Sequence, residues 1–198
     1  MGHTERARDD VITAYIAAAN FDRAATEALR AYGLPVLRYL RSMLHRDDAA
    51  CEVFSELSKN LWAGLPRFRH EASFRTWMYK LAWTAAQDWR RRTARDHVRR
   101  LETTEEGKLV AEPRSTTPWH ERTDARGRWQ AIKASLSAED RSLLVLRLEQ
   151  RLSWREAAEV MASHGSAPEP AALRKRFERL KHRLRVMAKE QGLYPKEQ

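Results

Sequence analysis

The segment of residues 74–92 limits the fold of this chain more than any other, because no glycine or proline interrupts it. Its apolar side chains recur at steps of three and four residues, the spacing of an amphipathic helix that buries one stripe. The stripe consists of Phe74, Trp77, Met78, Leu81 and Ala85. We therefore expect a long helix that begins near Glu71 and packs along this stripe.

A second face of the same helix carries Tyr79 and Trp83, four residues apart, with Arg75 four residues before Tyr79. Exposed aromatic rings beside guanidinium groups are suited to stacking unpaired nucleic-acid bases and holding their phosphates. The alternative is that both rings pack against a neighbouring helix, as an apolar helix face usually does. The spacing alone is compatible with both interpretations.

The chain is strongly basic, with a formal net charge of +10. Such a charge favours a polyanionic partner, either nucleic acid or an anionic membrane surface. Six arginines and a single acid, Asp96, lie between Arg90 and Arg100, and the missing counter-charges favour a phosphate partner. A membrane surface is the weaker alternative, because the arginine-rich faces lack neighbouring exposed apolar stripes.

Several features indicate a cytoplasmic protein. No apolar run approaches the roughly 20 residues that span a bilayer, and the N-terminus lacks the apolar core of a signal peptide. We therefore expect no membrane insertion. The single cysteine, Cys51, excludes an internal disulfide and fits a reducing compartment. Its small apolar neighbours, among them Ala50 and Val53, predict a packed thiol.

The composition changes between two helical parts of the chain. Residues 101–118 combine an excess of glutamates with glycine, proline, serine and threonine, which predicts a flexible acidic linker. With 198 residues, 42% of them hydrophobic, the rest suits an all-α fold of two small helical domains. The expected units are an N-terminal extension (1–21), a first domain (22–100), the linker (101–118), a second domain (119–190) and a tail (191–198).

Helix boundaries in the first domain follow from capping residues. Asp22 is the expected N-cap of a long helix in which Gly33 and Pro35 predict a kink or a break. Asp47 or Asp48 is the expected cap of the next helix.

The second domain reads as a helix over residues 119–135 followed by three more helices, the last strongly basic. Ser137 and Ser153 open capping-box-like sequences, and Ser166 is the expected cap of the last helix. A short capped helix, a turn and a basic helix are typical of a helix-turn-helix, whose last helix enters the DNA major groove. The basic residues are Arg174, Lys175, Arg176, Arg179, Lys181, Arg183 and Arg185.

The sequence contains no recognisable catalytic or metal-binding constellation. Its seven histidines are scattered, and none has a cysteine or histidine partner at the spacing of zinc ligands. Glycine-rich phosphate loops, nucleophile elbows and His-Glu-x-x-His sequences are absent. We therefore expect a binding protein that needs no metal or cofactor and is not an enzyme.

Both domains resemble the extracytoplasmic-function (ECF) sigma factors of bacterial RNA polymerase, members of the sigma-70 family. The first domain is similar to region two of these proteins and the second to region four. The residues that carry the resemblance are 38–41, 50–57, 61–62, 65–82, 88 and 91–92 in the first domain, and 136, 141, 146–147, 152–158 and 173–176 in the second. The resemblance excludes residues 1–20 and the linker.

The resemblance implies roles for three sets of residues. The first set would dock the coiled coil of the polymerase β′ subunit: Glu52, Phe54, Glu56, Leu57 and Trp62. The second would capture a base flipped out of the −10 element and hold the melted strand: Arg67, Phe68, Arg69, His70, Ser73, Arg75, Trp77, Tyr79, Trp83, Thr84, Arg90 and Arg91. The third would read the −35 element: Ala171, Ala172, Arg174, Lys175, Arg176, Arg179, Lys181 and Arg183.

The partners implied by the resemblance are core RNA polymerase with its β and β′ subunits, promoter DNA and an anti-sigma factor. The chain departs from the family pattern at Cys51, Ser55 and Thr84, and the turn between residues 161 and 173 is longer than usual. Two other functions stay open: a stand-alone helix-turn-helix transcription regulator, and a helical protein that sequesters a partner. A regulator would not need the strand-melting helix that residues 65–92 resemble.

Overall fold

The computed structural model describes residues 3–103, 125–163 and 166–193, and the regular elements in these ranges are helices. The predicted all-α fold is confirmed. The N-terminal half consists of α1 (His3–Ala17), α2 (Phe21–Leu44), α3 (Asp47–Gly64), the 3-10 turn η1 (Leu65–Arg67) and α4 (Phe74–Thr103). The C-terminal half consists of α5 (Ala125–Ala134), α6 (Ala138–Leu144), the π-helical turn η3 (Val145–Glu149), α7 (Trp154–Val160) and α8 (Pro170–Glu190).

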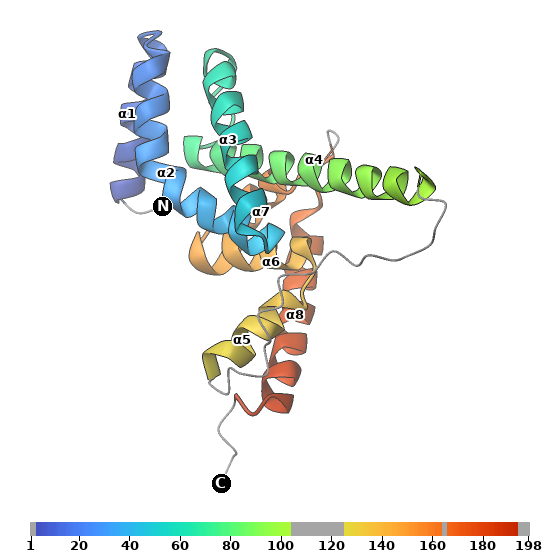
Figure 1. Ribbon diagram of the computed structural model, residues 1–198. Helices are drawn as coiled ribbons and strands as arrows, with labels where there is room; N and C mark the ends of the chain where they lie inside the picture. The colour runs from blue at the N-terminus through green and yellow to red at the C-terminus, as the bar shows by residue number, and fades with distance from the viewer. Residues whose placement is uncertain (1–2, 104–124, 164–165, 194–198) are drawn as a thin grey trace.

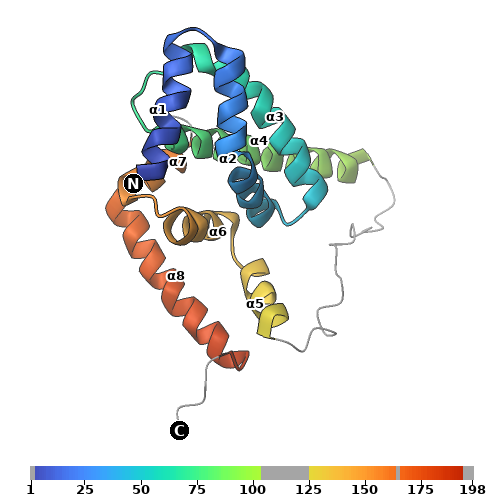
Figure 2. The same cartoon turned by 90° about the vertical axis from the view of Figure 1, so that its left-hand side faces the viewer.

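The two halves lie against each other. In the N-terminal half, α1 and α3 contact α2, and α4 crosses behind them (Figure 1). In the C-terminal half, α6 contacts α2 and α7 contacts α4, while α5 and α8 extend away from this contact (Figure 2). Buried apolar side chains from Ile12 to Phe177 form one cluster, so a single core continues through both halves.

The central helix α2 starts and runs differently from its prediction. Its N-cap is Asn20, whose side-chain oxygen accepts a hydrogen bond from the Arg23 N–H at 3.2 Å, and not Asp22. Pro35 lies inside a continuous helix. The proline removes one backbone donor, but the buried side chains around it, such as Val36 and Tyr39, hold the helix in the core.

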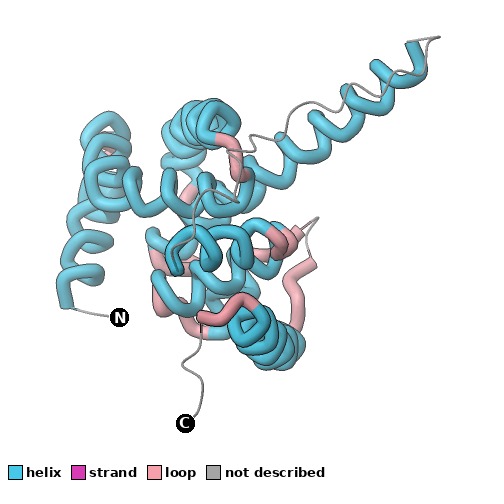
Figure 3. Tube along the Cα trace, turned by 60° about the horizontal axis from the view of Figure 1, so that its bottom comes forward, coloured by secondary structure: helices cyan, strands magenta, loops and turns pink. Residues whose placement is uncertain are grey.

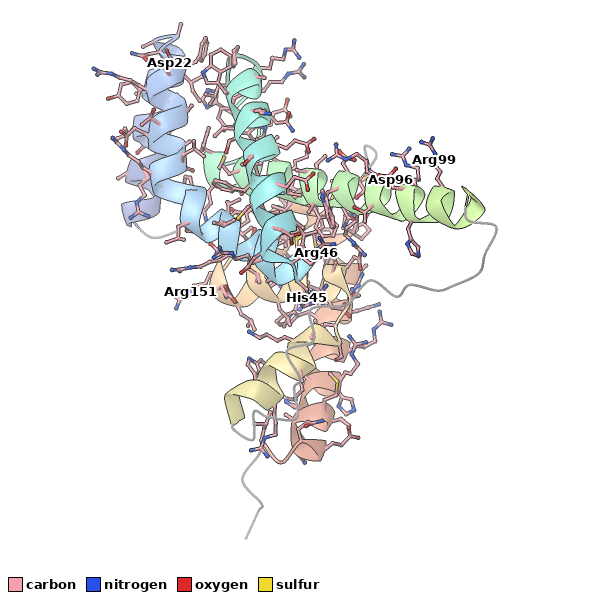
Figure 4. All side chains as sticks on the ribbon, in the orientation of Figure 1. Asp22, His45, Arg46, Asp96, Arg99 and Arg151 are labelled. Atoms are coloured by element: carbon pink, nitrogen blue, oxygen red, sulfur yellow. The ribbon has the colours of Figure 1, made fainter. Side chains whose placement is uncertain are left out.

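The turn from α2 to α3 is too short for the predicted aspartate cap. It consists of His45, in the left-handed region with φ 55°, and Arg46, which is the N-cap residue although its side chain does not cap the helix. Both residues are labelled in Figure 4. Asp47 and Asp48 instead belong to the first turn of α3, where their charge favours the helix N-terminus.

The long helix α4 begins at Phe74 and not near Glu71. Ser73 caps it, because its Oγ accepts a hydrogen bond from the Thr76 N–H at 3.1 Å. The helix continues to Thr103, so residues 101–103 of the predicted linker are helical, and residues 104–118 lie outside the described part. Its C-terminal part extends beyond the other helices (Figure 3), and Asp96 and Arg99 lie there (Figure 4).

Two of the three predicted caps in the C-terminal half are confirmed. Ser137 accepts from the Asp140 N–H, and Ser153 forms a complete capping box with Glu156. Ser166 does not cap α8, which begins at Pro170 after the N-cap Glu169. Ser166 instead exchanges two backbone hydrogen bonds with Ser163, at 2.9 and 3.0 Å, and this pairing closes part of the long turn before α8.

The prediction that Cys51 is packed is wrong. Its thiol is exposed, because α3 turns the neighbouring Ala50 and Val53 toward the core and Cys51 away from it. Across residues 3–103, 125–163 and 166–193, no helix is both long and apolar enough to cross a membrane.

Candidate nucleic-acid interface

An aromatic cluster joins the loop before α4 to the first turns of that helix. The Phe68 ring lies 5.0 Å from the Trp77 ring and 5.3 Å from the Phe74 ring, measured between centroids. The His70 ring lies 4.6 Å from Phe68 on the loop side. Offset and edge-to-face pairs at these distances are favourable, so the cluster fixes the loop against the helix.

The cluster forms one wall of a surface pocket of about 200 Å³. The pocket is lined by Arg67, Phe68, Arg69, Glu71, Ala72, Thr76, Trp77, Lys80 and Glu159. Aromatic rings next to cationic side chains are the combination that holds an unpaired base and its phosphates. The structure thus brings together four residues of the predicted −10 set, Arg67, Phe68, Arg69 and Trp77, in one concave site.

The junction between loop and helix is held by short polar contacts. Ser73 Oγ lies 2.8 Å from Thr76 Oγ1, and His70 adopts the left-handed region with φ 56°. A positive φ is uncommon outside glycine, and it turns the loop back toward the helix here. Ser73 and His70 therefore shape the pocket, although neither lines it.

Tyr79 and Trp83 do not form an exposed face, so the packing alternative is correct. Tyr79 is fully buried and its ring packs edge-to-face on Tyr39 of α2, with centroids 5.3 Å apart. Trp83 is 3% exposed. Both belong to the core cluster, because α2 and the C-terminal half cover faces of α4 that periodicity alone leaves open.

Arg75 and Thr76 are also buried, and they contact the C-terminal half. The Arg75 guanidinium, in a residue only 5% exposed, donates to the backbone carbonyl of Gln150. Thr76 Oγ1 donates to a carboxylate oxygen of Glu156 on α7 at 3.4 Å. In this arrangement Arg75, predicted to contact −10 DNA, serves the contact between the two halves.

The remaining predicted −10 residues lie further along α4. Thr84 is exposed. Arg90 donates to Glu139 of α6 at 3.1 Å, and Arg91 pairs with Asp88 one turn earlier. These two arginines therefore lie beside carboxylates of the chain itself.

The surface predicted to dock polymerase is only partly accessible. Leu57 has no exposed surface and Phe54 is half-buried. Trp62 is 57% exposed, and its indole N–H donates to Asp22 at 3.1 Å. Leu57 thus points into the core, while Trp62 stands on the surface.

Both glutamates of this surface contact α4. Glu56 pairs with Arg92 at 2.6 Å, and the Trp89 indole N–H donates to Glu52 at 3.1 Å. The hydrogen bond from Arg92 lowers the pKa of Glu56 below its usual value, more than the partial burial of the carboxyl raises it. The Glu56 carboxylate therefore stays ionised on the face that α3 and α4 share.

Some cations of the basic helix α8 are exposed, and others form ion pairs within the chain. Arg176 Nε and an Arg183 guanidinium nitrogen donate to the two oxygens of Asp140 on α6, at 2.7 and 2.6 Å. Lys181 pairs with Glu178 on α8 itself at 2.8 Å. The other predicted −35 residues are exposed: Ala171, Ala172, Arg174, Lys175 and Arg179.

The two ion pairs of Asp140, with Arg176 and Arg183, predict that the stability of the chain depends on pH. Burial alone would raise the pKa of Asp140, but the hydrogen bonds from Arg176 and Arg183 outweigh it and lower the pKa. The stability that the ionised group contributes is thus present above its unfolded pKa near 3.8 and is lost as pH falls through the lower folded pKa. We expect Asp140→Asn to lower the free energy of unfolding by about 1 kcal/mol at neutral pH, since both guanidinium groups are partly exposed.

Urea unfolding of both chains between about pH 3 and pH 6 measures this effect. The difference between the wild-type chain and Asp140→Asn should shrink toward the acid end, because the carboxyl of the unfolded chain takes up a proton there before the native carboxylate does. A difference in the free energy of unfolding that stays constant over this pH range would contradict the stabilising role of the Asp140 ion pairs.

Polar contacts between the halves include buried groups. The Tyr39 hydroxyl lies 2.6 Å from Ser142 Oγ, and Arg141 donates to the Met43 carbonyl at 2.9 Å. Arg141 also donates to the carbonyl of Leu136 at 2.6 Å. Burial raises the pKa of Tyr39, so its hydroxyl stays protonated in this contact.

Sequence reasoning missed three acidic residues that shape this interface. Asp140 and Glu156 are the acids of the two capping-box-like sequences, and no role was expected for Glu159. Their contacts with Arg176, Thr76 and the pocket join segments far apart in the chain. No local spacing signals such contacts. Among the described residues, no group of histidine, cysteine, aspartate or glutamate side chains is arranged to hold a metal ion.

The family model of sigma-70 region 2 matches residues 28–96. This segment includes α3, the pocket loop and most of α4. Over this segment the chain is similar to the sigma-70 family. Its resemblance to ECF sigma factors is confirmed by this match and by a curated relative. RNA polymerase sigma factor YlaC of Bacillus subtilis (strain 168) is 26% identical over 132 residues, which cover 67% of this chain and 76% of that protein.

Two solved structures share the fold of this chain. One is CnrH in complex with the cytosolic domain of CnrY, with a TM-score of 0.62 and 19% identity, covering 92% of this chain and 98% of that chain. The other is the sigma factor RpoE in complex with the anti-sigma factor NepR from Bartonella quintana, with a TM-score of 0.60 and 16% identity, covering 83% and 96%.

Proposed function

We propose that this chain is an ECF-type sigma factor that directs core RNA polymerase to specific promoters and helps to open them. The proposal rests chiefly on the pocket of Phe68 and Trp77, because it combines stacking rings with the cations of Arg67, Arg69 and Lys80 within the region matched to sigma-70 region 2. One flipped base of the −10 element would stack in this pocket while the cations bind the flanking phosphates.

The −35 element would be read by α8. Its exposed N-terminal residues Ala171, Ala172 and Arg174 would approach base edges in the major groove, with Lys175 and Arg179 on phosphates. Arg176 and Arg183 would instead hold the helix at a fixed angle through Asp140. This division replaces the sequence-based assignment of all these arginines to DNA.

Core polymerase would dock on the exposed surface of α3 and α4, where Trp62, Glu52 and Glu56 lie. Leu57 would support this surface from beneath. An anti-sigma factor is a further expected partner, because the solved RpoE structure with the same fold contains one.

Helix α7 lies beside the pocket that would bind the −10 base. Glu159 of α7 lines the pocket, and Glu156 lies beside Thr76 and Arg75. Because these carboxylates repel phosphates, we propose that α7 moves away when the melted strand binds. The buried contacts between the halves would then open.

Glu159→Gln tests this movement. Removing the pocket carboxylate is expected to tighten binding of a single-stranded −10 oligonucleotide to the free chain by about fivefold, the factor for one exposed charge pair. Fluorescence anisotropy at fixed salt measures the affinity, and Glu149→Gln, an exposed glutamate on η3, is the matched control. Equal affinities for both variants would contradict the proposed position of the strand.

The experiment that tests the proposed function compares two DNA probes. Holoenzyme reconstituted from core polymerase and this chain should bind a fork with an unpaired non-template −10 strand more tightly than the same sequence as duplex. A stand-alone regulator would bind the duplex tightly without polymerase. Failure of the chain to bind core polymerase would overturn the proposal.

A further inference from the structure

Asp9 lies on α1, outside the residues 28–96 that match the family model. Its neighbours Arg8 and Asp10 are exposed, whereas Asp9 is half-buried. The hydroxyl of Tyr32, a buried residue of α2, donates to Asp9 Oδ1 at 2.6 Å. One turn further along α1, Ile12 is 1% exposed and anchors the helix in the core. Asp9 is therefore held in place from two sides.

Asp9 also accepts hydrogen bonds from the backbone N–H groups of Phe74 and Arg75. These are the first two residues of α4, whose N–H groups have no acceptor inside the helix. Ser73 takes the next two donors: its Oγ accepts from Thr76 at 3.1 Å and its carbonyl from Trp77 at 3.0 Å. The donors of the first turn of α4 are thus divided between a local cap and a carboxylate of α1.

The environment of Asp9 fits this role. Burial raises the pKa of Asp9, while the hydrogen bonds from Tyr32 and from the backbone of Arg75 and Phe74 oppose that rise. The carboxylate also lies at the positive end of the α4 dipole, where a negative charge is favourable. Arg75 adds a nearby positive charge.

The part of α4 that Asp9 holds also builds the pocket. Thr76 and Trp77 line the pocket within the first turn, and Lys80 lines it one turn later. The Phe74 ring lies between Tyr32 and Phe68, with centroid distances of 6.4 and 5.3 Å. A shift of the first turn of α4 would therefore move the aromatic wall of the pocket.

We propose that Asp9 is a positioning residue, which completes the N-terminal cap of α4 and thereby sets the geometry of the pocket. The N-terminal extension is then part of the strand-binding apparatus. The pocket's role in strand binding rests on the proposed function, but the cap itself does not.

The cap is tested by hydrogen exchange on the full-length chain. Asp9→Ala should speed exchange of the Phe74 and Arg75 amides by about fivefold, because loss of a cap costs on the order of 1 kcal/mol. The Thr76 amide, which Ser73 holds, is the internal reference. Asp10→Ala, an exposed aspartate on the same helix, should leave all these amides unchanged, and so should Asp9→Asn, since asparagine caps as well as aspartate.

The positioning role is tested with reconstituted holoenzyme. Asp9→Ala should weaken binding of a single-stranded −10 oligonucleotide by about fivefold, while binding of a −35 duplex stays unchanged. Asp9→Asn should restore the affinity to within about twofold. The affinities of the wild-type chain, Asp9→Ala and Asp9→Asn are compared at a temperature at which thermal melting shows that each chain is folded.

The outcomes distinguish the cap, the positioning role and the proposed function from one another. Unchanged exchange at Phe74 and Arg75 in Asp9→Ala overturns the cap. Faster exchange with unchanged oligonucleotide affinity overturns the positioning role. If wild-type holoenzyme shows no affinity for the single strand, the proposed function has failed, and the exchange data alone decide on the cap.

Discussion

Trp83→Ala is expected to lower the free energy of unfolding by about 3–5 kcal/mol, the usual range for deleting a buried tryptophan side chain. Trp83 is 3% exposed and belongs to the core cluster that runs through both halves. The cavity lies between packed helices, so the surroundings can collapse onto it only in part. Urea unfolding followed by circular dichroism measures the loss.

Two variants serve as controls for Trp83→Ala. Thr84→Ala changes the next residue of α4, which is exposed, and should stay within about 0.5 kcal/mol of the wild-type chain. Trp83→Phe should cost less than about 1.5 kcal/mol, because it keeps most of the volume and removes an indole N–H with no acceptor among the described residues. A Trp83→Ala chain as stable as Thr84→Ala, but defective in promoter melting, would mean that the ring faces DNA.

Phe68→Ala is expected to weaken binding of the unpaired −10 strand to the holoenzyme by about 1–3 kcal/mol, the stacking contribution of one ring per base. Phe68 is half-buried, lines the pocket and contacts Phe74 and Trp77, so its ring is fixed in one orientation before DNA arrives. Anisotropy titration with a fork probe measures the affinity, and stopped-flow fluorescence measures the rate of opening.

Phe68→Tyr is the matched control, because it keeps the ring and should retain most of the affinity. Binding of duplex DNA through the −35 element should be nearly unchanged in both variants, since α8 lies outside the pocket. An equal loss for duplex and for unpaired strand in Phe68→Ala would contradict the stacking role.

Local patterns were sufficient for the helices and for several of their ends. The apolar stripe of residues 74–85 predicted α4, and the Ser137 and Ser153 sequences predicted two helix starts. These signals work because a cap or a stripe depends on residues within four positions of each other. The basic helix α8 was found for the same reason.

Long-range packing decided the points that local patterns left open. Tyr79 and Trp83 have helical spacing that fits either a DNA-binding face or a core face, and the packing of α2 and the C-terminal half against α4 makes it a core face. Arg75 reads as a DNA contact, but Gln150, a residue far along the chain, accepts its hydrogen bond. The hydrogen bonds between Asp9 and the start of α4 were not predicted for the same reason, because they join residues far apart in the chain.

The measurement that tests the sigma-factor proposal most directly is transcription by core polymerase reconstituted with this chain, in competition with a primary sigma factor. The transcripts made from genomic DNA are then sequenced. New start sites that share a pair of short upstream motifs are the predicted result, with Phe68→Ala reducing their yield. Failure of the chain to bind core polymerase, or transcripts identical to those of the primary sigma factor alone, would contradict the proposal.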